Sequence, residues 1–296
     1  MSELETFADG EARIIDRGYR RYDGPRRGVR GAMAAVTVHS LQRALGLRRT
    51  FWAKLLPIVV IAMAYVPAIV FVGAVALLPD ADARALVLPS YGDYYGFVIS
   101  ALMVFVGLVA PEVLCTDRRT GMLGVYLAAP LDRDTYLTAK AAAIAAALSL
   151  VCLGPPLLML IANLLQSQGP EGVGDIVDTT LRVLACGAVL TAMFTGLTMG
   201  ITSLTDRKAV AAASIILLFL VSLTVASTIA ESGGPEGAYA WSPTSLSLEL
   251  AQRVHGEYSP IMSGVPGITV WGAWALWTFG GFALARWRLH VLPVTR

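Results

Sequence analysis

Side chains that commonly act as metal ligands or nucleophiles are few in this chain and far apart. The three cysteines, Cys115, Cys152 and Cys186, share no short spacing with one another or with the three histidines. Zinc sites and disulfide frameworks need such residues in clusters. Because the cysteines lie in or beside apolar runs, we expect them to pack as small apolar side chains. The sequence predicts no metal site and no catalytic residues.

The lysines give no sign of nucleotide chemistry. A phosphate-binding loop places its lysine directly after glycine, in the pattern Gly-x-x-x-x-Gly-Lys. Lys54, Lys140 and Lys208 each follow alanine or arginine, and the sequence also lacks Gly-x-Ser-x-Gly and His-Glu-x-x-His. We therefore expect that the chain is not an enzyme, holds no cofactor and does not hydrolyse ATP by itself.

The composition is that of a membrane protein. Hydrophobic residues make up 56% of the 296 residues and charged residues only 15%, against about 25% charged residues in ordinary soluble domains. A helix that crosses ~30 Å of hydrocarbon needs roughly 20 apolar residues. An all-α integral membrane fold with six transmembrane helices is predicted, at residues 55–78, 96–114, 141–165, 183–204, 209–230 and 266–285.

Positive charge is distributed unevenly between the loops. Twenty of the 23 Lys and Arg residues precede the first predicted span, follow the second or fourth, or follow the sixth. The other loops hold Arg84, Arg182 and Arg253 beside ten acidic residues. Because Lys and Arg accumulate in cytoplasmic loops, we expect both termini in the cytoplasm.

Before the first span the chain changes character twice. Residues 1–32 are polar and Arg-rich, without the apolar centre of a signal peptide, and predict a cytoplasmic N-terminal segment. Residues 33–50 predict an interfacial amphipathic helix that leads into the transmembrane domain, residues 51–296. The alternative is a simple extension of the first span. The apolar stripe of this helix would consist of Ala34, Val38, Leu41 and Leu45.

Three local features refine the spans and loops. Pro155 and Pro156 lack backbone N–H groups and should kink or break the third span. In the fourth span Gly196 and Gly200 lie beside a row of threonines, which favours close helix packing over a substrate-lining role. In the last external loop, leucines four residues apart predict a short helix over 244–254.

The cytoplasmic loop between the second and third spans predicts a short helix between two charged clusters. Gly121 and Pro130 bracket this helix. Leu123 and Leu127 lie one turn apart and therefore face the same way. Two such leucines indicate that a partner covers them, or that the helix folds back on the membrane surface.

This loop resembles that of the permease subunits of ABC-2 type exporters. That family carries here a pattern close to Glu-Arg-x-x-Gly-Thr-Leu-Glu-x-Leu-Leu-x-x-Pro-Val-Ser-Arg-x-x-Tyr-x-x-x-Lys. Residues 117–140 align with it without a gap, with Asp117, Met122, Gly124 and Ala139 as departures. The six spans and the long last external loop are similar too. The positions in register are Arg118, Gly121, Leu123, Leu127, Pro130, Arg133, Tyr136 and Lys140.

The resemblance implies a multi-pass protein of the bacterial cytoplasmic (inner) membrane, with a partner that supplies energy. In such exporters two permeases pair with two copies of a separate ATPase, which holds ATP and Mg. The loop after the second span forms a coupling helix that rests in a groove of the ATPase. The coupling residues carried over to this chain are Asp117, Arg118, Thr120, Gly121, Leu123, Leu127, Pro130, Arg133 and Lys140.

The resemblance also implies a substrate path between two permease copies, lined by the second and fifth spans. In this sequence the lining is mostly apolar, which favours export of an amphipathic or lipid-like substrate. The lipid bilayer, the ATPase and a second permease copy are the expected partners, and no nucleic acid is expected. The lining residues offered by this chain are Met103, Phe105, Phe219, Ser222 and Thr224.

Other functions fit parts of the same sequence. One is an ABC-type membrane subunit that assists maturation of another envelope protein or cofactor. An integral-membrane lipid enzyme is disfavoured because paired acids are missing from the spans. An ion-driven carrier is disfavoured because Glu112 is the only ionisable Asp, Glu, Lys or Arg within them. The segment Tyr19–Pro25 resembles an N-terminal signature of some bacterial permeases, and its arginines would also suit an anchor to anionic lipid.

Overall fold

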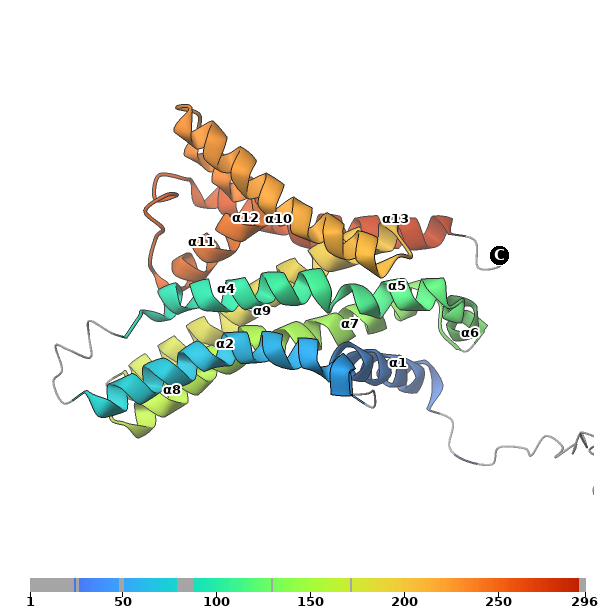
Figure 1. Cartoon of the computed structure of the whole chain (residues 1–296), viewed down its shortest axis with the longest axis horizontal. Coiled ribbons are helices and arrows are strands. Elements are labelled where there is room, and N and C mark those ends of the chain that lie inside the picture. Colours follow the sequence, from blue (N-terminus) through green and yellow to red (C-terminus); the bar gives the residue numbers. More distant parts are fainter. Residues whose placement is uncertain are drawn as a thin grey trace, which may run out of the picture.

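A computed structural model describes residues 24, 27–47, 51–78, 88–128, 130–170 and 172–292 (Figure 1). Most of the predicted N-terminal segment 1–32, including nearly all of Tyr19–Pro25, lies outside the described residues. The regular structure of the described part is helical throughout. The predicted all-α class is therefore confirmed.

All six predicted apolar stretches form helices. Each is long and apolar enough to cross a membrane, which indicates a multi-pass membrane protein. Several extend beyond their predicted ends, because polar residues continue the helix past the apolar stretch. The spans are α2 (Phe51–Leu77), α4 (Tyr91–Leu108) with α5 (Pro111–Arg119), α7 (Arg133–Cys152) with α8 (Gly154–Leu165), α9 (Val173–Leu204), α10 (Lys208–Glu231), and α12 (Gly267–Ala275) with η2 (Leu276–Gly280) and α13 (Gly281–Val291).

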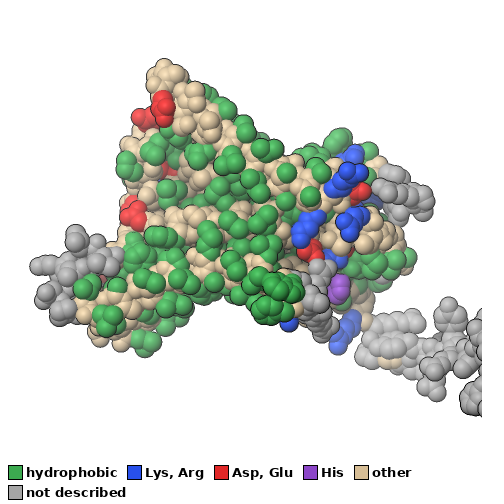
Figure 2. All heavy atoms as spheres, viewed as in Figure 1, with side chains coloured by type: hydrophobic (Ala, Val, Ile, Leu, Met, Phe, Trp, Pro, Cys, Tyr) green, Lys and Arg blue, Asp and Glu red, His purple; other side chains and the backbone are tan. Residues whose placement is uncertain are grey.

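The spans divide into an inner and an outer set. In α4–α5 and in α9, 67% of the most apolar window is buried inside the protein, against 22% in α2, in α10 and in the last span. Large side chains such as Tyr94, Tyr95 and Phe194 fill the centre. The outer helices expose leucines, isoleucines and valines (Figure 2). Such a wide apolar surface suits lipid as its surrounding.

The third span breaks where the two prolines were predicted to break it. α7 ends at Cys152 and α8 begins at Gly154, so that Pro155 and Pro156 lie in the first turn of the second piece. Proline is tolerated there because the first-turn N–H groups need no helical partner. The hydroxyl of Tyr65 donates to the carbonyl of Leu150 at 3.0 Å beside the break. A side chain thus satisfies a backbone group near the break.

The glycines of the fourth span serve close packing, as predicted. A Cβ atom at Gly196 would overlap the backbone of Thr278, and one at Gly281 would overlap the carbonyl of Gly196. At Gly200 a Cβ atom would lie 3.0 Å from the Cα of Gly281. α9 and the last span therefore cross with their backbones in contact, in the manner of small-residue interfaces in membranes.

The helix predicted in the last external loop exists and is buried. α11 (Pro243–His255) follows a short 3-10 helix, η1 (Glu236–Trp241), and Leu246 and Leu250 are fully buried. α10 leans away from α4 toward its C-terminal end, and α11 lies between the two (Figure 1). α11 is thus packed into the protein core. Burial at the end of this helix lowers the pKa of His255.

The first described helix differs from its prediction in its bounds and in part of its buried side. α1 (Gly28–Ala44) begins before residue 33 and ends before 50, at a turn in which Gly46 has a φ of 67°. Its buried residues are Val36, Ser40 and Ala44, whereas the expected stripe residue Val38 is 52% exposed. Leu41 and Leu45 of that stripe pack against the core, and the polar residue Ser40 also packs inward, against a buried lysine of α7.

Candidate functional site

The predicted coupling loop lies at one end of the molecule, called here the basic end. α1, α5, α6 (Met122–Ala128) and the C-terminal half of α13 meet there (Figure 1). Lys and Arg side chains gather at this end, and acidic side chains mark the opposite end around η1 and α11 (Figure 2). The structure thereby preserves the uneven charge seen in the loops.

A short helix between two turns forms the tip of the basic end. α5 ends at Arg119 and is followed by Thr120, whose hydroxyl donates to the carbonyl of Thr116 at 2.8 Å. Gly121 has a φ of 71°, a left-handed conformation that suits glycine. The two turns of α6 follow at once. The predicted short helix is therefore present.

The side chains of α6 do not face the way the sequence suggested. Leu123 is buried, with 9% of its surface exposed, and belongs to the main apolar core. Leu127 is half-buried and packs against the same core. The protein itself covers Leu123 and part of Leu127, so Leu123 is not the exposed contact that the sequence suggested. The exposed apolar residues are Met122, at 37%, and Val125, at 62%.

Asp117 and Lys140, predicted in a loop, are fully buried. Their side chains form an ion pair with an N–O distance of 2.5 Å. Arg43 of α1 approaches the other carboxylate oxygen of Asp117 at 2.7 Å. A buried charge is costly unless it is paired, and here one carboxylate serves two cations. The sequence placed these residues outside the spans because it contained no sign that α1 would fold over them.

Neutral groups complete this buried cluster. The hydroxyl of Tyr136 donates to Asp117 at 3.0 Å, and the ammonium of Lys140 donates to the hydroxyl of Ser40 at 2.7 Å. The ammonium also lies 5.4 Å from the ring centre of Tyr126 and 5.5 Å from that of Tyr136. Aromatic faces attract cations at such distances. The buried ion cluster therefore joins α1, α5 and α7 directly beneath α6.

Two arginines tie the same region to the backbone of its neighbours. Arg118 donates to the carbonyls of Ser203, at 2.5 Å, and Thr205, at 3.1 Å, where α9 ends. Arg43 donates to the carbonyls of Glu112, at 3.2 Å, and Val113, at 3.0 Å. Carbonyls at a helix end lack helical partners, so Arg118 caps α9. The sequence analysis missed Arg43 and Ser40, although their spacing of three residues places them on one side of α1.

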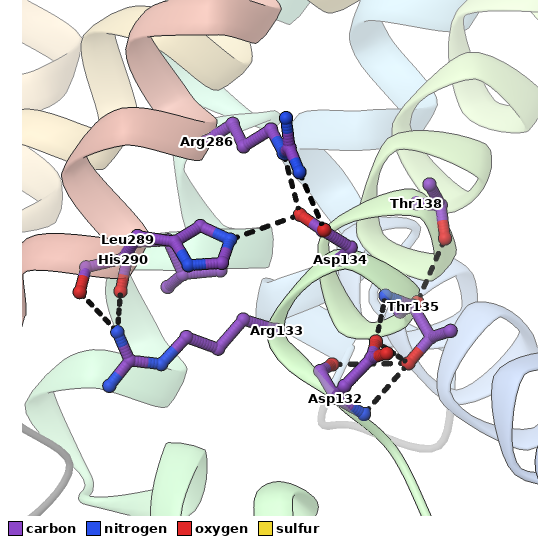
Figure 3. Close-up of polar contacts among 8 residues, drawn as sticks. All are labelled: Asp132, Arg133, Asp134, Thr135, Thr138, Arg286, Leu289 and His290. Atoms are coloured by element: carbon purple, nitrogen blue, oxygen red, sulfur yellow. Dashed lines mark hydrogen bonds and ion pairs between the residues drawn. The ribbon is translucent and has the colours of Figure 1, made fainter.

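The start of α7 is fastened to α13 (Figure 3). Arg133 donates to the carbonyls of Leu289, at 3.1 Å, of Leu292, at 3.2 Å, and of His290. The carboxylate of Asp134 accepts hydrogen bonds from Nε and Nη2 of Arg286, each at 2.9 Å. One of its oxygens also lies 3.2 Å from Nε2 of His290. Arg133 is thus a cap for the last helix.

A capping box begins α7 beside these contacts. The carboxylate of Asp132 accepts from the backbone N–H of Thr135 at 2.7 Å and from its hydroxyl at 2.6 Å. These hydrogen bonds from Thr135 hold the pKa of the Asp132 carboxyl below its usual range. The capping box fixes where α7 starts. The turn that contains Pro130 is thereby held between two fixed helices.

The five predicted lining residues do not form one surface. Met103 and Phe219 line one groove of about 240 Å³ between α4 and α10. Phe105 is buried in the core, and Thr224 is exposed and bonds to the carbonyl of Leu220 in its own helix. Ser222 lies 3.3 Å from the hydroxyl of Ser242. We call the groove the apolar groove, lined by Met103, Val104, Gly107, Leu108, Ile216, Phe219 and Leu220.

Comparisons with known proteins do not assign a family. The chain matches no model of a known protein family, and none of the curated proteins matches it. Within the described ranges, no group of three His, Cys, Asp or Glu residues could hold a metal ion. The similarity to ABC-2 permeases therefore rests on residues 117–140 and on the six spans.

Proposed function

We propose that this chain is the membrane-spanning permease subunit of an ATP-driven exporter of the ABC-2 type. The basic end faces the cytoplasm, and the opposite end faces outward. A separate ATPase, present in two copies, binds ATP and Mg and supplies the energy. A second permease copy completes the transport unit, and the substrate is amphipathic or lipid-like.

The observation that carries this proposal is the construction of α6. It is a seven-residue helix at the tip of the basic end, and it exposes Met122 and Val125 to the surroundings. Two such side chains on a short helix among charged residues favour a protein partner. A coupling helix must present an apolar contact of this kind. The contact residues are Met122 and Val125, in place of the inward-facing leucines.

The groups beneath α6 suit the transmission of movement. Asp117 and Lys140 bind α5 to α7 and, through Arg43, to α1. Arg118 holds the end of α9, and Arg133 holds the end of α13. A push on α6 would thus act on five helices, α1, α5, α7, α9 and α13, which short polar contacts connect. Because buried packed groups deform little, these helices would move together.

The apolar groove between α4 and α10 supports an amphipathic substrate. Its walls come from the second and fifth spans, and it opens on the side where α10 is mostly exposed. A second copy placed against α10 would enclose this face. A path with apolar walls disfavours small ions and sugars, because these would lose water without gaining hydrogen bonds.

The test is the double variant Met122→Asp with Val125→Asp. When the wild-type chain is purified from native membranes, we expect the partner ATPase to copurify with it and to show ATPase activity. The chain without its partner should show none. A carboxylate buried in the partner groove costs about 2 kcal/mol or more. We therefore expect a loss of about 30-fold or more of copurified ATPase activity and of transport in vesicles.

A matched control changes two exposed apolar residues at the opposite end. Val173→Asp with Ile261→Asp should leave the ATPase bound, because both positions lie far from α6. Leu123→Asp is unsuitable, since it would disturb the core itself. Full recovery of the ATPase and of transport in the Met122 and Val125 variant would show that α6 is not the coupling element.

A further inference from the structure

Two cavities share one lining residue, Leu108, the last residue of α4. The apolar groove runs from there between α4 and α10. The other cavity, of about 770 Å³, opens at the basic end and carries three cations on an apolar floor. We call it the basic mouth, lined by Leu56, Leu108, Arg119, Arg207, Lys208, Ala209 and Ala212. A ligand that fills both cavities would need a charged part and an apolar part.

The charges of the basic mouth favour an anion. Arg119 and Arg207 are exposed, and neither guanidinium has a carboxylate partner among the described residues. Lys208 pairs with Glu112 at 2.8 Å. Glu112 and Asp206 line a neighbouring cavity of about 210 Å³, which shares Arg119 and Lys208 with the mouth. The lining of the mouth itself contains no acid, and its three cations outnumber these two neighbouring acids, so the guanidiniums of Arg119 and Arg207 favour a negatively charged group.

The size of the apolar groove limits what part of a ligand it can hold. Sites that enclose a drug-sized ligand measure roughly 300–1,000 Å³. The groove, at about 240 Å³, falls below that range, and the basic mouth, at about 770 Å³, falls within it. The groove therefore fits a segment of an alkyl chain, and the mouth fits a headgroup.

We propose that the basic mouth and the apolar groove together bind an anionic glycerophospholipid, or an amphiphile of that chemistry, from the adjoining leaflet. Arg119 and Arg207 hold the phosphate, and one alkyl chain lies between α4 and α10. Arginine forks match phosphate oxygens, and basic pockets between spans bind anionic headgroups. This deepens the proposed function by naming the class of substrate, and rests on it for the cytoplasmic side of the mouth.

Neither part of the site would serve another class of ligand equally well. A free phosphate would use the arginines and leave the groove empty. A zwitterionic lipid would fill the groove, but its own cation would oppose the guanidiniums. Near a membrane surface each Lys or Arg is worth about fivefold in affinity for an anionic lipid. Loss of two arginines should therefore weaken binding by roughly 25-fold.

The experiment titrates the full chain, purified in a neutral detergent, with palmitoyl-oleoyl phosphatidylglycerol and follows bound lipid by native mass spectrometry. The first variant is Arg119→Gln with Arg207→Gln. Its control is Arg27→Gln with Arg30→Gln, which removes two exposed cations of α1 at the same end. A second variant, Leu220→Trp, fills the groove from α10 and leaves the mouth intact.

We expect one tightly bound phosphatidylglycerol on the wild type and on the control. Binding should fall roughly 25-fold in the arginine variant and also fall in Leu220→Trp. Phosphatidylcholine should bind weakly, and inorganic phosphate should not compete. Equal binding of the two lipids, an unchanged arginine variant, or competition by phosphate would each overturn the proposal. No ATPase takes part, so this failure would be distinct from failure of the proposed function.

Discussion

Asp117 is fully buried and contacts the side chains of Arg43, Tyr136 and Lys140. One carboxylate thus faces two cations inside the protein. Removing one partner from a buried ion pair is far more costly than the net value of the pair, because the remaining charge loses its compensation. Removal of the single acid, Asp117, should therefore destabilise the protein more than removal of one of the two cations.

The predicted consequence is an asymmetry between two conservative variants. Asp117→Asn should lower the free energy of unfolding by about 3–5 kcal/mol, because it leaves two buried cations without an anion. Lys140→Met should cost clearly less, since Arg43 still pairs with Asp117. Thermal unfolding in detergent measures both. Equal losses in the two variants would mean that the buried ion cluster does not act as one unit.

At the residue scale, the sequence indicated the right region but not the right side chains. The spacing of Gly121, Pro130 and the leucines predicted α6 correctly. It could not show that Leu123 turns inward, because a pattern of two leucines fits a contact with the protein core as well as one with a partner. Arg43 was missed since its contacts come from residues far along the chain.

At the scale of elements, the crossing of α9 with the last span depends on glycines. Gly196 meets the backbone of Thr278, and Gly281 meets that of Gly196. Such a contact brings backbones closer than any side chain would allow. The same helix contains Gly174, beside which a Cβ atom would meet nothing within 4 Å. α9 therefore offers a test position and a control position of the same type.

Gly196→Ala should destabilise the protein by about 1–3 kcal/mol, because a methyl group would force the two backbones apart. Gly174→Ala should be neutral or stabilise by up to about 1 kcal/mol, since alanine favours helix and nothing obstructs it. Thermal unfolding in one detergent compares them. If both variants unfold at the wild-type temperature, the backbones do not touch at Gly196.

The elements themselves were largely predictable, and their packing was not. The length of the apolar stretches predicted the six spans, and Pro155 and Pro156 predicted the break between α7 and α8. The spacing of Leu246 and Leu250 predicted α11 but not its burial against α4. Periodicity shows that a helix has an apolar face without showing what covers that face. The predicted stripe of α1 included Leu41 and Leu45, which pack against the core, but it missed Ser40, which packs inward onto Lys140.

At the scale of the molecule, charge separates the two ends. Most of the described cations cluster around α1, α5, α7 and α13, whereas Glu236 lies in η1, Glu249 in α11 and Glu257 just after α11 (Figure 2). Lys and Arg accumulate on the cytoplasmic side of membrane proteins, whereas acids contribute little to orientation. The predicted orientation follows from this distribution and is independent of any ATPase.

Cysteine labelling tests that orientation on intact cells with a reagent that does not cross membranes. Arg30→Cys, on the exposed side of α1, should remain unlabelled from outside and react only after the membrane is opened. Glu236→Cys, at the start of η1, should react at once. Cys115, Cys152 and Cys186 are buried, so the native chain supplies a low background. Labelling of Arg30→Cys from outside, with none at Glu236→Cys, would place the basic end outside and exclude α6 as a contact for a cytoplasmic ATPase.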